Sequence, residues 1–216
     1  MAVNVVVSDG EEMIFRFFKK VQIIREQTKA EKKAFIREGI TAKWFDLSEE
    51  RRRKDSQLAE KNLAKYLDNI GAKRVLFYAS MEDEPSTDET LDRWITDPNK
   101  TLVLTRTCNR SKQLDPLIVT SWDDLEMGKF RIRVPKPDCE IIDLINLDAV
   151  VVPGRAFDMS RNRLGRGYGF YDRFLSVIPS KVPLIGLAFD FQIVKPLPVE
   201  EHDIPMDVII TQKKII

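Results

Sequence analysis

The sequence predicts an α/β fold, a three-layer domain in which a mostly parallel central sheet is flanked by helices on both faces. Short runs of mostly apolar residues, the clearest being residues 147–152 (LDAVVV), are typical of strands buried on both faces. Between these runs lie segments with an apolar residue at every third or fourth position, which is typical of helices. Strands that alternate with helices in this way favour a parallel sheet covered by helices.

The chain is predicted to contain a short extension and one domain. We expect residues 1–24 to form a partly disordered N-terminal extension and residues 25–216 to form a single domain. The formal net charge of +1 gives no overall field that would attract nucleic acid or a membrane. Cys108 and Cys139 lie far apart without metal-ligand spacing, as in proteins with free thiols. We therefore expect a cytoplasmic monomer with no nucleic-acid or membrane partner.

Two helices are predicted before the first strand. From about Met13 to Leu47 apolar residues recur at spacings of three and four, which indicates one helical segment. Ser48, followed by two glutamates, caps a second helix that runs to about Asn69 and ends at Gly71.

Residues 16–54 are strongly basic. They include 13 Lys and Arg but only 6 Asp and Glu, although the whole chain is nearly neutral. Most of these charges are expected on a solvated helix face. The alternative is that one or two of them reach a bound anion.

The remaining elements are predicted from short apolar runs and helix caps. Their order is a strand at 74–79, a helix from a cap at 86–88 through 95, a strand at 101–105, a hairpin or edge pair formed by 117–119 and 130–134, a strand at 147–152, a helix from about 171 to 178, and strands at 183–188 and 207–210. Ligands bind such sheets beyond the carboxyl ends of the strands. The stretches predicted to lie there are 81–84, 106–110, 153–170 and 202–205.

Arg163–Asp172 (RLGRGYGFYD) has the composition of a phosphate-binding loop. Three of the nine glycines in the chain, Gly165, Gly167 and Gly169, stand at alternate positions beside two arginines. Bare backbone lets a bulky anion approach and lets N–H groups turn toward it, while guanidinium groups suit phosphate. The loop matches neither the P-loop nor the dinucleotide-binding pattern. The alternative interpretation is a glycine-rich surface turn.

Two further residues narrow the chemistry. Asp172 follows the glycines, where a carboxylate can bind Mg²⁺ together with phosphate oxygens; a plain acidic residue at a helix start is the alternative. His202 is the only histidine in the chain. A histidine-based nucleophile system would rest on that one side chain, and a zinc site built from several histidines is excluded.

The glycine-rich loop belongs to a longer stretch that resembles a known signature. Residues 150–175, VVVPGRAFDMSRNRLGRGYGFYDRFL, are similar to the signature of the 5-formyltetrahydrofolate cyclo-ligase family, also called methenyltetrahydrofolate synthetases. The other blocks that resemble the family, in the same order along the chain, are 33–37 (KAFIR) with Ser48 after it, 78–87 (YASMEDEPST) and 185–211 (IGLAFDFQIVKPLPVEEHDIPMDVIIT). Together these blocks extend over residues 33–211.

The resemblance implies an activity. Members of the family convert 5-formyltetrahydrofolate and MgATP to 5,10-methenyltetrahydrofolate, ADP and phosphate. The formyl oxygen attacks the γ-phosphate to form an iminophosphate, after which N10 closes the ring and phosphate leaves. Such phosphoryl transfer mainly requires positioning and charge neutralisation. We therefore expect ATP as co-substrate, Mg²⁺ as cofactor, and a folate, with or without a polyglutamate tail, as substrate.

The resemblance also implies roles for individual residues. Arg163 and Arg166 are expected to be catalytic, and Asp172 and Asp203 are expected to hold Mg²⁺. The expected ATP-binding residues are Lys33, Arg37, Arg163, Leu164, Gly165, Arg166, Gly167, Tyr168, Gly169, Phe170 and Tyr171. The expected folate-binding residues are Arg37, Ala79, Glu84, Arg166, Gly167, Tyr168, Gly169 and Phe170. A carboxylate at Glu84 suits a pterin, because it accepts hydrogen bonds from N–H groups.

The chain departs from the family pattern at several positions. Phe170 replaces the first tyrosine of the usual Tyr-Tyr-Asp, Tyr168 stands where glycine or lysine is common, and Arg155 stands where a small or apolar residue is usual. Residues 131–137 (RIRVPKP) match only loosely, so the aromatic side chain that stacks on the pterin is unassigned. Phe130 is a candidate for it.

Three other residues are expected to support the site without reacting. His202 is expected to orient Asp203. Phe157 and Asp158 are expected to pack against the loop and to cap it.

Two other functions agree with parts of the sequence. A non-catalytic relative of the same fold would bind RNA or a protein through the basic segment. It would not be expected to keep the complete set of Lys33, Arg37, Glu84, Asp172 and Asp203. A different ATP-dependent ligase or kinase is the other alternative. Glu84 separates it from a folate enzyme, because a pterin needs a hydrogen-bond acceptor that a generic nucleotide site does not.

Overall fold

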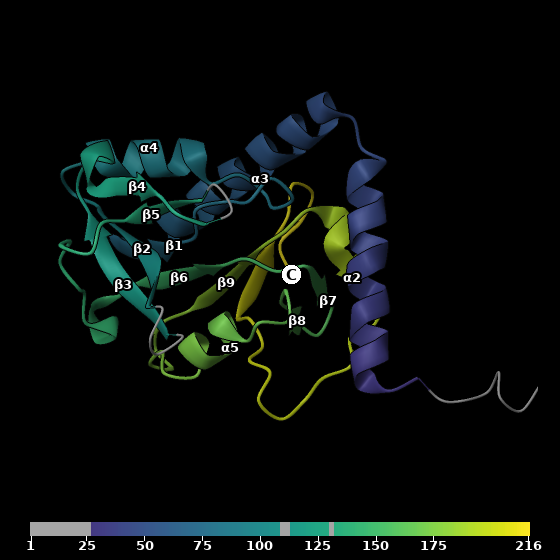
Figure 1. The fold of residues 1–216 in the computed structure, drawn as a ribbon. Coiled ribbons are helices and arrows are strands. Elements are labelled where there is room, and N and C mark those ends of the chain that lie inside the picture. The colour runs from purple at the N-terminus through teal and green to yellow at the C-terminus, as the bar shows by residue number, and fades with distance from the viewer. Residues whose placement is uncertain (1–26, 109–112, 130–131) are drawn as a thin grey trace, which may run out of the picture.

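The structure is a computed structural model that describes residues 27–108, 113–129 and 132–216 (Figure 1). The predicted extension, residues 1–24, lies outside the described residues, as do the beginning of the first predicted helix and the candidate aromatic Phe130. Within the described ranges, no helix is both long and apolar enough to cross a membrane.

A six-stranded sheet forms the centre of the fold. Its strands, in spatial order, are β11 (Val208–Ile210), β9 (Leu184–Leu187), β6 (Ala149–Val152), β1 (Arg74–Phe77), β2 (Thr101–Cys108) and β3 (Gln113–Val119). Neighbouring strands are parallel except for β2 and β3, which are antiparallel. The strands β6 and β9 are buried along their whole length, as their continuous apolar runs predict.

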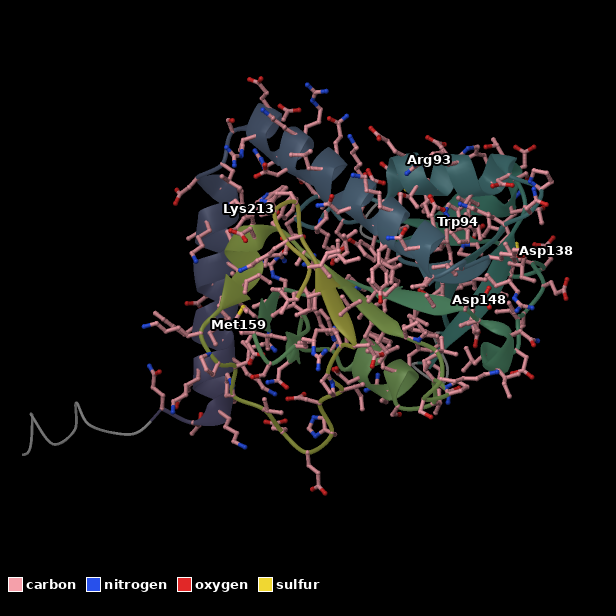
Figure 2. All side chains as sticks on the ribbon, turned by 180° about the vertical axis from the view of Figure 1, so that it is seen from behind. Arg93, Trp94, Asp138, Asp148, Met159 and Lys213 are labelled. Carbon is pink, nitrogen blue, oxygen red and sulfur yellow. The ribbon has the colours of Figure 1, made fainter. Side chains whose placement is uncertain are left out.

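Helices cover both faces of this sheet, so the predicted three-layer α/β class is confirmed (Figure 1). The helices on one face are α3 (Glu49–Asn69) and α4 (Asp88–Thr96), and the helix on the other face is α5 (Phe170–Leu175). Successive residues of a strand point to opposite faces, so Val75 and Phe77 of β1 pack with α3 and α4 while Leu76 packs with α5. Trp94 of α4 meets Phe77 edge-on, with 5.0 Å between the ring centroids (Figure 2).

The first described helix, α2 (Lys29–Phe45), lies beyond the end of the central sheet and packs on a second, smaller sheet (Figure 1). The strands of the smaller sheet are β10 (Ile193–Val194), β7 (Ala156–Asp158) and β8 (Arg163–Leu164). Ile40 of α2 packs with Ala156 and Leu164 in a separate core cluster. The sequence does not predict this sheet, because strands of two or three residues are too short to show a period.

A two-stranded hairpin corrects one predicted pairing. The remaining elements are β4 (Leu125–Met127), β5 (Arg133–Pro135) and the 3-10 helices η1 (Trp122–Asp124), η3 (Leu144–Asn146) and η4 (Asp190–Gln192). Residues 117–119 were expected to pair with 130–134, but β3 pairs with the preceding strand β2, and β5 pairs with β4. Antiparallel strands that follow one another in the sequence need only a short connection. In both cases the strand therefore pairs with its neighbour in the sequence.

The second predicted helix is confirmed at both ends. The Ser48 side chain accepts a hydrogen bond from the backbone N–H of Arg51 at 3.2 Å, which caps α3. At the other end Gly71 has a φ of +66°, a left-handed conformation that glycine adopts without strain.

Residues 27 and 28 were expected to lie inside the first predicted helix but are not helical. Thr28 has extended backbone and forms a capping box with Glu31, so the helix begins at Lys29. Apolar periodicity continues across such a cap and does not reveal it.

Packing around Phe157 predicts a large effect for a small substitution. Phe157 is fully buried, and a Cβ added at Gly154 would lie 2.5 Å from its ring. We expect Gly154→Ala to lower the free energy of unfolding by about 1–3 kcal/mol through overpacking. A Cβ at Gly39, inside α2, would meet nothing within 4 Å. We therefore expect Gly39→Ala to raise the free energy of unfolding by about 0.5–1 kcal/mol. Urea denaturation measures both changes, and a stable Gly154→Ala variant would contradict this packing.

Candidate functional site

The predicted site residues gather where several segments meet at the carboxyl edge of the central sheet. These segments are the loop after β1, the loop between β8 and α5, the turn before β11, and one face of α2. Lys33, Arg37 and Thr41 follow one another at intervals of four residues, so they share this face of α2. The helix therefore presents two cations and a hydroxyl to the loops.

Lys33 and Arg37 tie α2 to two of these segments. Lys33 Nζ lies 2.9 Å from an oxygen of Asp203 and 3.6 Å from Glu200 in the turn before β11. Arg37 Nε donates a hydrogen bond of 2.9 Å to the carbonyl of Gly165. Two of the residues predicted to bind the nucleotide thus lie one turn apart on α2, and each contacts a different segment of the site.

The glycine-rich loop has the backbone freedom that its composition predicts. Gly167 and Gly169 have φ values of +98° and +68°, which other residues adopt only with strain. A Cβ at Gly167 would lie 3.5 Å from the Arg37 guanidinium. Tyr168, between them, is 71% exposed. The loop therefore runs close to Arg37 and turns the Tyr168 side chain outward.

Arg163 is a buried cation held by Asp172. The two side chains form an ion pair, and Arg163 Nη1 donates to the carbonyl of Pro153 at 3.1 Å. The Cζ atom of Arg163 also lies 5.7 Å from the ring centroid of Tyr171. Within the described part of the chain, Arg163 Nε has no hydrogen-bond partner. A buried donor without a hydrogen-bond partner destabilises the folded protein. A ligand oxygen that accepted a hydrogen bond from Arg163 Nε would remove this cost.

Arg166 lies on two carboxylates of the loop after β1. Its Nη2 donates to Glu84 at 2.9 Å and also pairs with Asp83. Burial lowers the pKa of the Arg166 guanidinium, but the hydrogen bond to Asp83 and the charges of both carboxylates outweigh burial and raise the pKa. Burial raises the pKa of Asp83, but Arg166 and Arg155 outweigh this effect and lower it. Asp83 and Arg166 therefore stay charged at neutral pH.

The two carboxylates expected to hold Mg²⁺, Asp172 and Asp203, belong to different segments of the chain, but both act on the Arg37 guanidinium. Burial and the charge of Arg155 lower the pKa of Arg37, while Asp172 and Asp203 both raise it in part. The net pKa is lowered. Asp203 also lies within 4.8 Å, ligand atom to ligand atom, of Glu200 and His202. Carboxylate oxygens are the donors that Mg²⁺ prefers, so the chemistry of Asp172 and Asp203 fits the expected ion.

Phe157, Asp158 and His202 were expected to support the site without reacting. Phe157 is fully buried, and the Asp158 carboxylate accepts backbone hydrogen bonds from Ser160, Asn162 and Leu197, so both have the expected structural roles. His202 Nε2 lies 3.2 Å from Glu200 but 4.0 Å from Asp203, and the side chain is exposed. His202 is therefore more closely associated with Glu200 than with Asp203.

A cavity beside Glu84 contains residues that the sequence did not single out. Its volume is about 710 Å³, and its lining includes Trp44, Glu60, Met81, Glu84 and Phe189. Glu84 contributes to this cavity and also contacts Arg166 of the glycine-rich loop. Polar residues such as Glu60 look like solvent-facing positions of a helix, so their role is hidden in the sequence.

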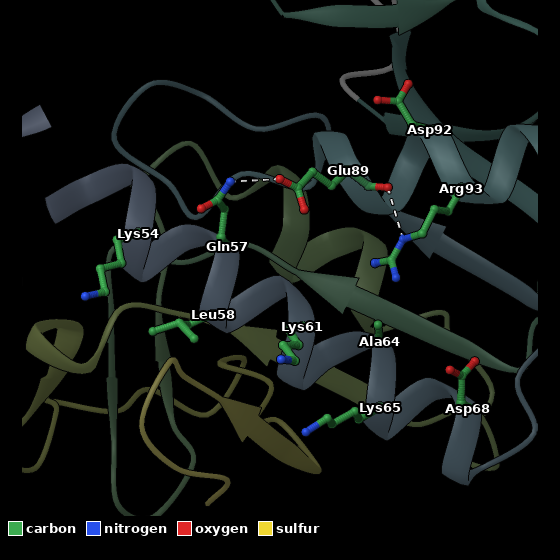
Figure 3. Close-up of a pocket in the computed structure, with 10 residues that line it drawn as sticks. All are labelled: Lys54, Gln57, Leu58, Lys61, Ala64, Lys65, Asp68, Glu89, Asp92 and Arg93. Atoms are coloured by element: carbon green, nitrogen blue, oxygen red, sulfur yellow. Dashed lines mark hydrogen bonds between the residues drawn. The ribbon is translucent and has the colours of Figure 1, made fainter. Parts of the chain in front are cut away.

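A second cavity lies between α3 and α4, away from the predicted residues. Its volume is about 790 Å³, and Figure 3 shows Lys61, Lys65 and Arg93 among the side chains around it. Gln57 from α3 and Glu89 from α4 bridge it with a hydrogen bond of 3.0 Å. None of the predicted site residues lines it.

Glu60 makes the stability of the protein depend on pH. Its carboxylate is buried and accepts a hydrogen bond from the backbone N–H of Thr90 in the first turn of α4, at 3.1 Å. Burial raises the pKa of Glu60 from 4.5 to about 7, a rise that the Thr90 hydrogen bonds limit. Between these two values the folded protein binds more protons than the unfolded chain does. The free energy of unfolding therefore falls as the pH rises through this window.

We expect Glu60→Gln to remove this pH dependence. An amide oxygen can still accept from Thr90 but carries no charge, so the variant should match the wild type near pH 5. At pH 8 it should be more stable by roughly 1–3 kcal/mol. Urea denaturation at both pH values measures this, with Glu50→Gln, exposed on the same helix, as the control. An unchanged pH profile in Glu60→Gln would contradict the assignment.

Comparison with known proteins identifies the family of this chain. The sequence model described as "5-formyltetrahydrofolate cyclo-ligase family" matches residues 29–212. A 5-formyltetrahydrofolate cyclo-ligase from Mus musculus is 31% identical over 74% of this chain and 84% of its own length. The Escherichia coli (strain K12) cyclo-ligase is 42% identical, but the match spans 43% of this chain and only 52% of that protein.

Solved structures agree with the sequence matches. The NMR structure of Aquifex aeolicus 5,10-methenyltetrahydrofolate synthetase has a TM-score of 0.74 and 31% identity, and the match covers 85% of this chain and 91% of that one. The Mycoplasma pneumoniae 5,10-methenyltetrahydrofolate synthetase shares the fold, with a TM-score of 0.68 at 20% identity over 83% of this chain and 98% of that one. By sequence and by structure, the chain belongs to the 5-formyltetrahydrofolate cyclo-ligase family.

Proposed function

We propose that this chain converts 5-formyltetrahydrofolate and ATP, with Mg²⁺, to 5,10-methenyltetrahydrofolate, ADP and phosphate. The observation that supports this most is the gathering of the expected cations and carboxylates at one edge of the sheet. Lys33 and Arg37 lie on α2, Arg163 and Arg166 flank the glycine-rich loop, and Glu84 follows β1. These residues come from three separate blocks of the sequence and meet only in the fold.

The nucleotide phosphates are placed at the glycine-rich loop. Gly167 and Gly169 leave space for an anion, and Lys33, Arg37 and Arg163 supply charge around it. Phosphoryl transfer requires mainly that the reacting groups be positioned and that developing charge be stabilised. The side chains of this site provide both without a histidine base.

Asp172 and Asp203 are the residues that would hold Mg²⁺. Once bound, the ion would neutralise negative charge on the phosphates. In the structure the two carboxylates are neutralised by Arg163 and Lys33. Phosphate oxygens compete for the same two cations, so nucleotide binding would release both carboxylates for the ion.

The folate is placed beside Glu84. The pterin would occupy the cavity that Glu84 shares with Met81, and its N–H groups would donate to the Glu84 carboxylate. The formyl oxygen then attacks the γ-phosphorus, and the bond to the departing ADP oxygen breaks. N10 adds to the formyl carbon, loses its proton, and the phosphate leaves with the former formyl oxygen. Arg166, in contact with Glu84, lies between the folate and the phosphates.

Product formation tests this function directly. The absorbance of the methenyl-folate product should rise when the purified protein is mixed with MgATP and 5-formyltetrahydrofolate. Omitting either ATP or Mg²⁺ should abolish the rise. A protein that binds neither ligand and forms no product would refute the proposal and would favour the non-catalytic, RNA- or protein-binding alternative.

Glu84→Gln should weaken folate binding far more than ATP binding. A neutral amide accepts hydrogen bonds more weakly and can present only one oxygen, so a buried charged acceptor is lost. A loss of roughly 2–4 kcal/mol in folate binding corresponds to about a 30- to 1,000-fold higher Kd. Calorimetric titrations with each ligand measure the two affinities. Equal losses for folate and for ATP would contradict the pterin assignment.

Asp172→Asn and Asp203→Asn should both change the Mg²⁺ dependence of turnover. We expect Asp172→Asn to lower kcat by orders of magnitude, with partial recovery at high Mg²⁺, and Asp203→Asn to act in the same way but more mildly. The effects in the double variant should be clearly non-additive if the carboxylates share one ion. Asp190→Asn, which removes an exposed partner of Lys213, is the matched control. Additive effects with an unshifted Mg²⁺ dependence would show that no ion is shared.

A further inference from the structure

Two arginines and two carboxylates form a connected network beside the glycine-rich loop. Arg166 bonds to both Asp83 and Glu84, and Arg155 forms a second ion pair with Asp83. Neither Asp83 nor Arg155 is among the residues expected to bind a ligand. The network carries two positive and two negative charges, so it is neutral before any ligand binds.

The two carboxylates hold Arg166 in different ways. Asp83 accepts from both terminal nitrogens: Nη2 bonds to Oδ1, and Nη1 lies 3.4 Å from Oδ2. Glu84 uses the single oxygen Oε1, which accepts from Nε at 3.2 Å and from Nη2 at 2.9 Å. The Asp83 contact is therefore bidentate and involves the two terminal nitrogens of the guanidinium. The Glu84 contact involves one carboxylate oxygen and the edge formed by Nε and Nη2. Two-pronged pairs fix the orientation of an arginine more firmly than single-oxygen contacts do.

Arg155 anchors Asp83 to the body of the protein. The Arg155 side chain is only 6% exposed, and its two terminal nitrogens contact Asp83 and the Thr41 hydroxyl of α2. A cation so deeply buried requires a partner, so removing Arg155 would leave Asp83 with one cation and without its link to α2.

We propose that Asp83 is a positioning residue for Arg166 and that Arg155 holds Asp83 in place. The inference rests on the proposed function, in which Glu84 binds the pterin. When the pterin N–H groups take the Glu84 oxygens, Arg166 loses the partner on its side edge but stays attached to Asp83. The Nε–H and one Nη2–H then become available to the formyl oxygen and to the phosphate that it acquires. Asp83 thus keeps the Arg166 guanidinium in its orientation when the contact with Glu84 is lost, and prevents it from rotating into solvent.

Steady-state kinetics of Asp83→Asn and Arg155→Met test this proposal. An asparagine cannot accept two charge-assisted bonds, so the Arg166 guanidinium loses its fixed orientation. We expect kcat to fall about 10- to 100-fold in Asp83→Asn, because small displacements of a positioned group cost that much. The KM for 5-formyltetrahydrofolate should stay within about threefold, since Glu84 and its backbone partner Met81 are unchanged. Arg155→Met should show the same pattern to a smaller degree.

Two comparisons separate positioning from a purely structural role. Because Arg155 acts through Asp83, adding Arg155→Met to Asp83→Asn should change kcat by less than about twofold. Arg155→Lys, which keeps the charge, should recover part of the kcat lost in Arg155→Met. Asp68→Asn, which breaks the exposed pair with Lys100, is the matched control and should leave kcat unchanged. Melting temperatures of all variants identify any that fail to fold at the assay temperature.

Failure of this proposal and failure of the proposed function would give different results. The proposal is overturned if folded Asp83→Asn keeps its kcat within about twofold, if kcat falls only together with a rise in folate KM, or if the Asp83 and Arg155 effects multiply. In each of these cases the wild type still turns over, so the proposed function stands. A wild type that binds folate and ATP without turnover would refute the proposed function, and with it this inference.

Discussion

The site depends on one constraint, that charges taken out of water must be paired. Arg155 and Arg163 have side chains that are 6% and 3% exposed, and each faces a carboxylate of the same site. An unpaired charge at such depth would cost several kcal/mol, so neither arginine can be buried without its partner. The same pairing fixes two arginines of the glycine-rich loop, because Asp172 pairs with Arg163 and Asp83 pairs with Arg166 as well as with Arg155.

In the proposed function the nucleotide and the metal ion are electrically linked, because Lys33 and Arg163 are each paired with a carboxylate before ligands bind. ATP adds several negative charges, and the cations nearest to the loop already neutralise carboxylates. If phosphates recruit Lys33 and Arg163, then Asp203 and Asp172 are left as unpaired carboxylates, which repel the phosphates. A divalent cation removes that repulsion by bridging carboxylate and phosphate oxygens. Under the proposed function, the charges of this site therefore match a nucleotide with its metal ion better than a nucleotide alone.

The sequence predicts those features that depend on local pattern. Continuous apolar runs located the strands of the central sheet, and the spacing of Gly165, Gly167 and Gly169 located the loop. The partner of β3 was predicted wrongly, and the sheet formed by β7, β8 and β10 was not predicted, because partners and very short strands leave no local signal. The same reason applies to the site. Arg155 and Asp83 are 72 positions apart, so the sequence shows two charges without showing that they meet.

The helix α2 connects the parts of the site that sequence reasoning treats separately. Lys33 reaches the turn before β11, Arg37 reaches the glycine-rich loop, and Thr41 reaches Arg155. These contacts lie on one face of the helix, and Ile40 and Trp44 on the adjacent turns are buried in the protein. A shift of α2 would therefore displace its contacts with Asp203, with the glycine-rich loop and with Arg155 at the same time. The burial of Ile40 and Trp44 fixes the position of α2. The position of α2 in turn determines how its three contacts lie relative to one another, which no single contact could do.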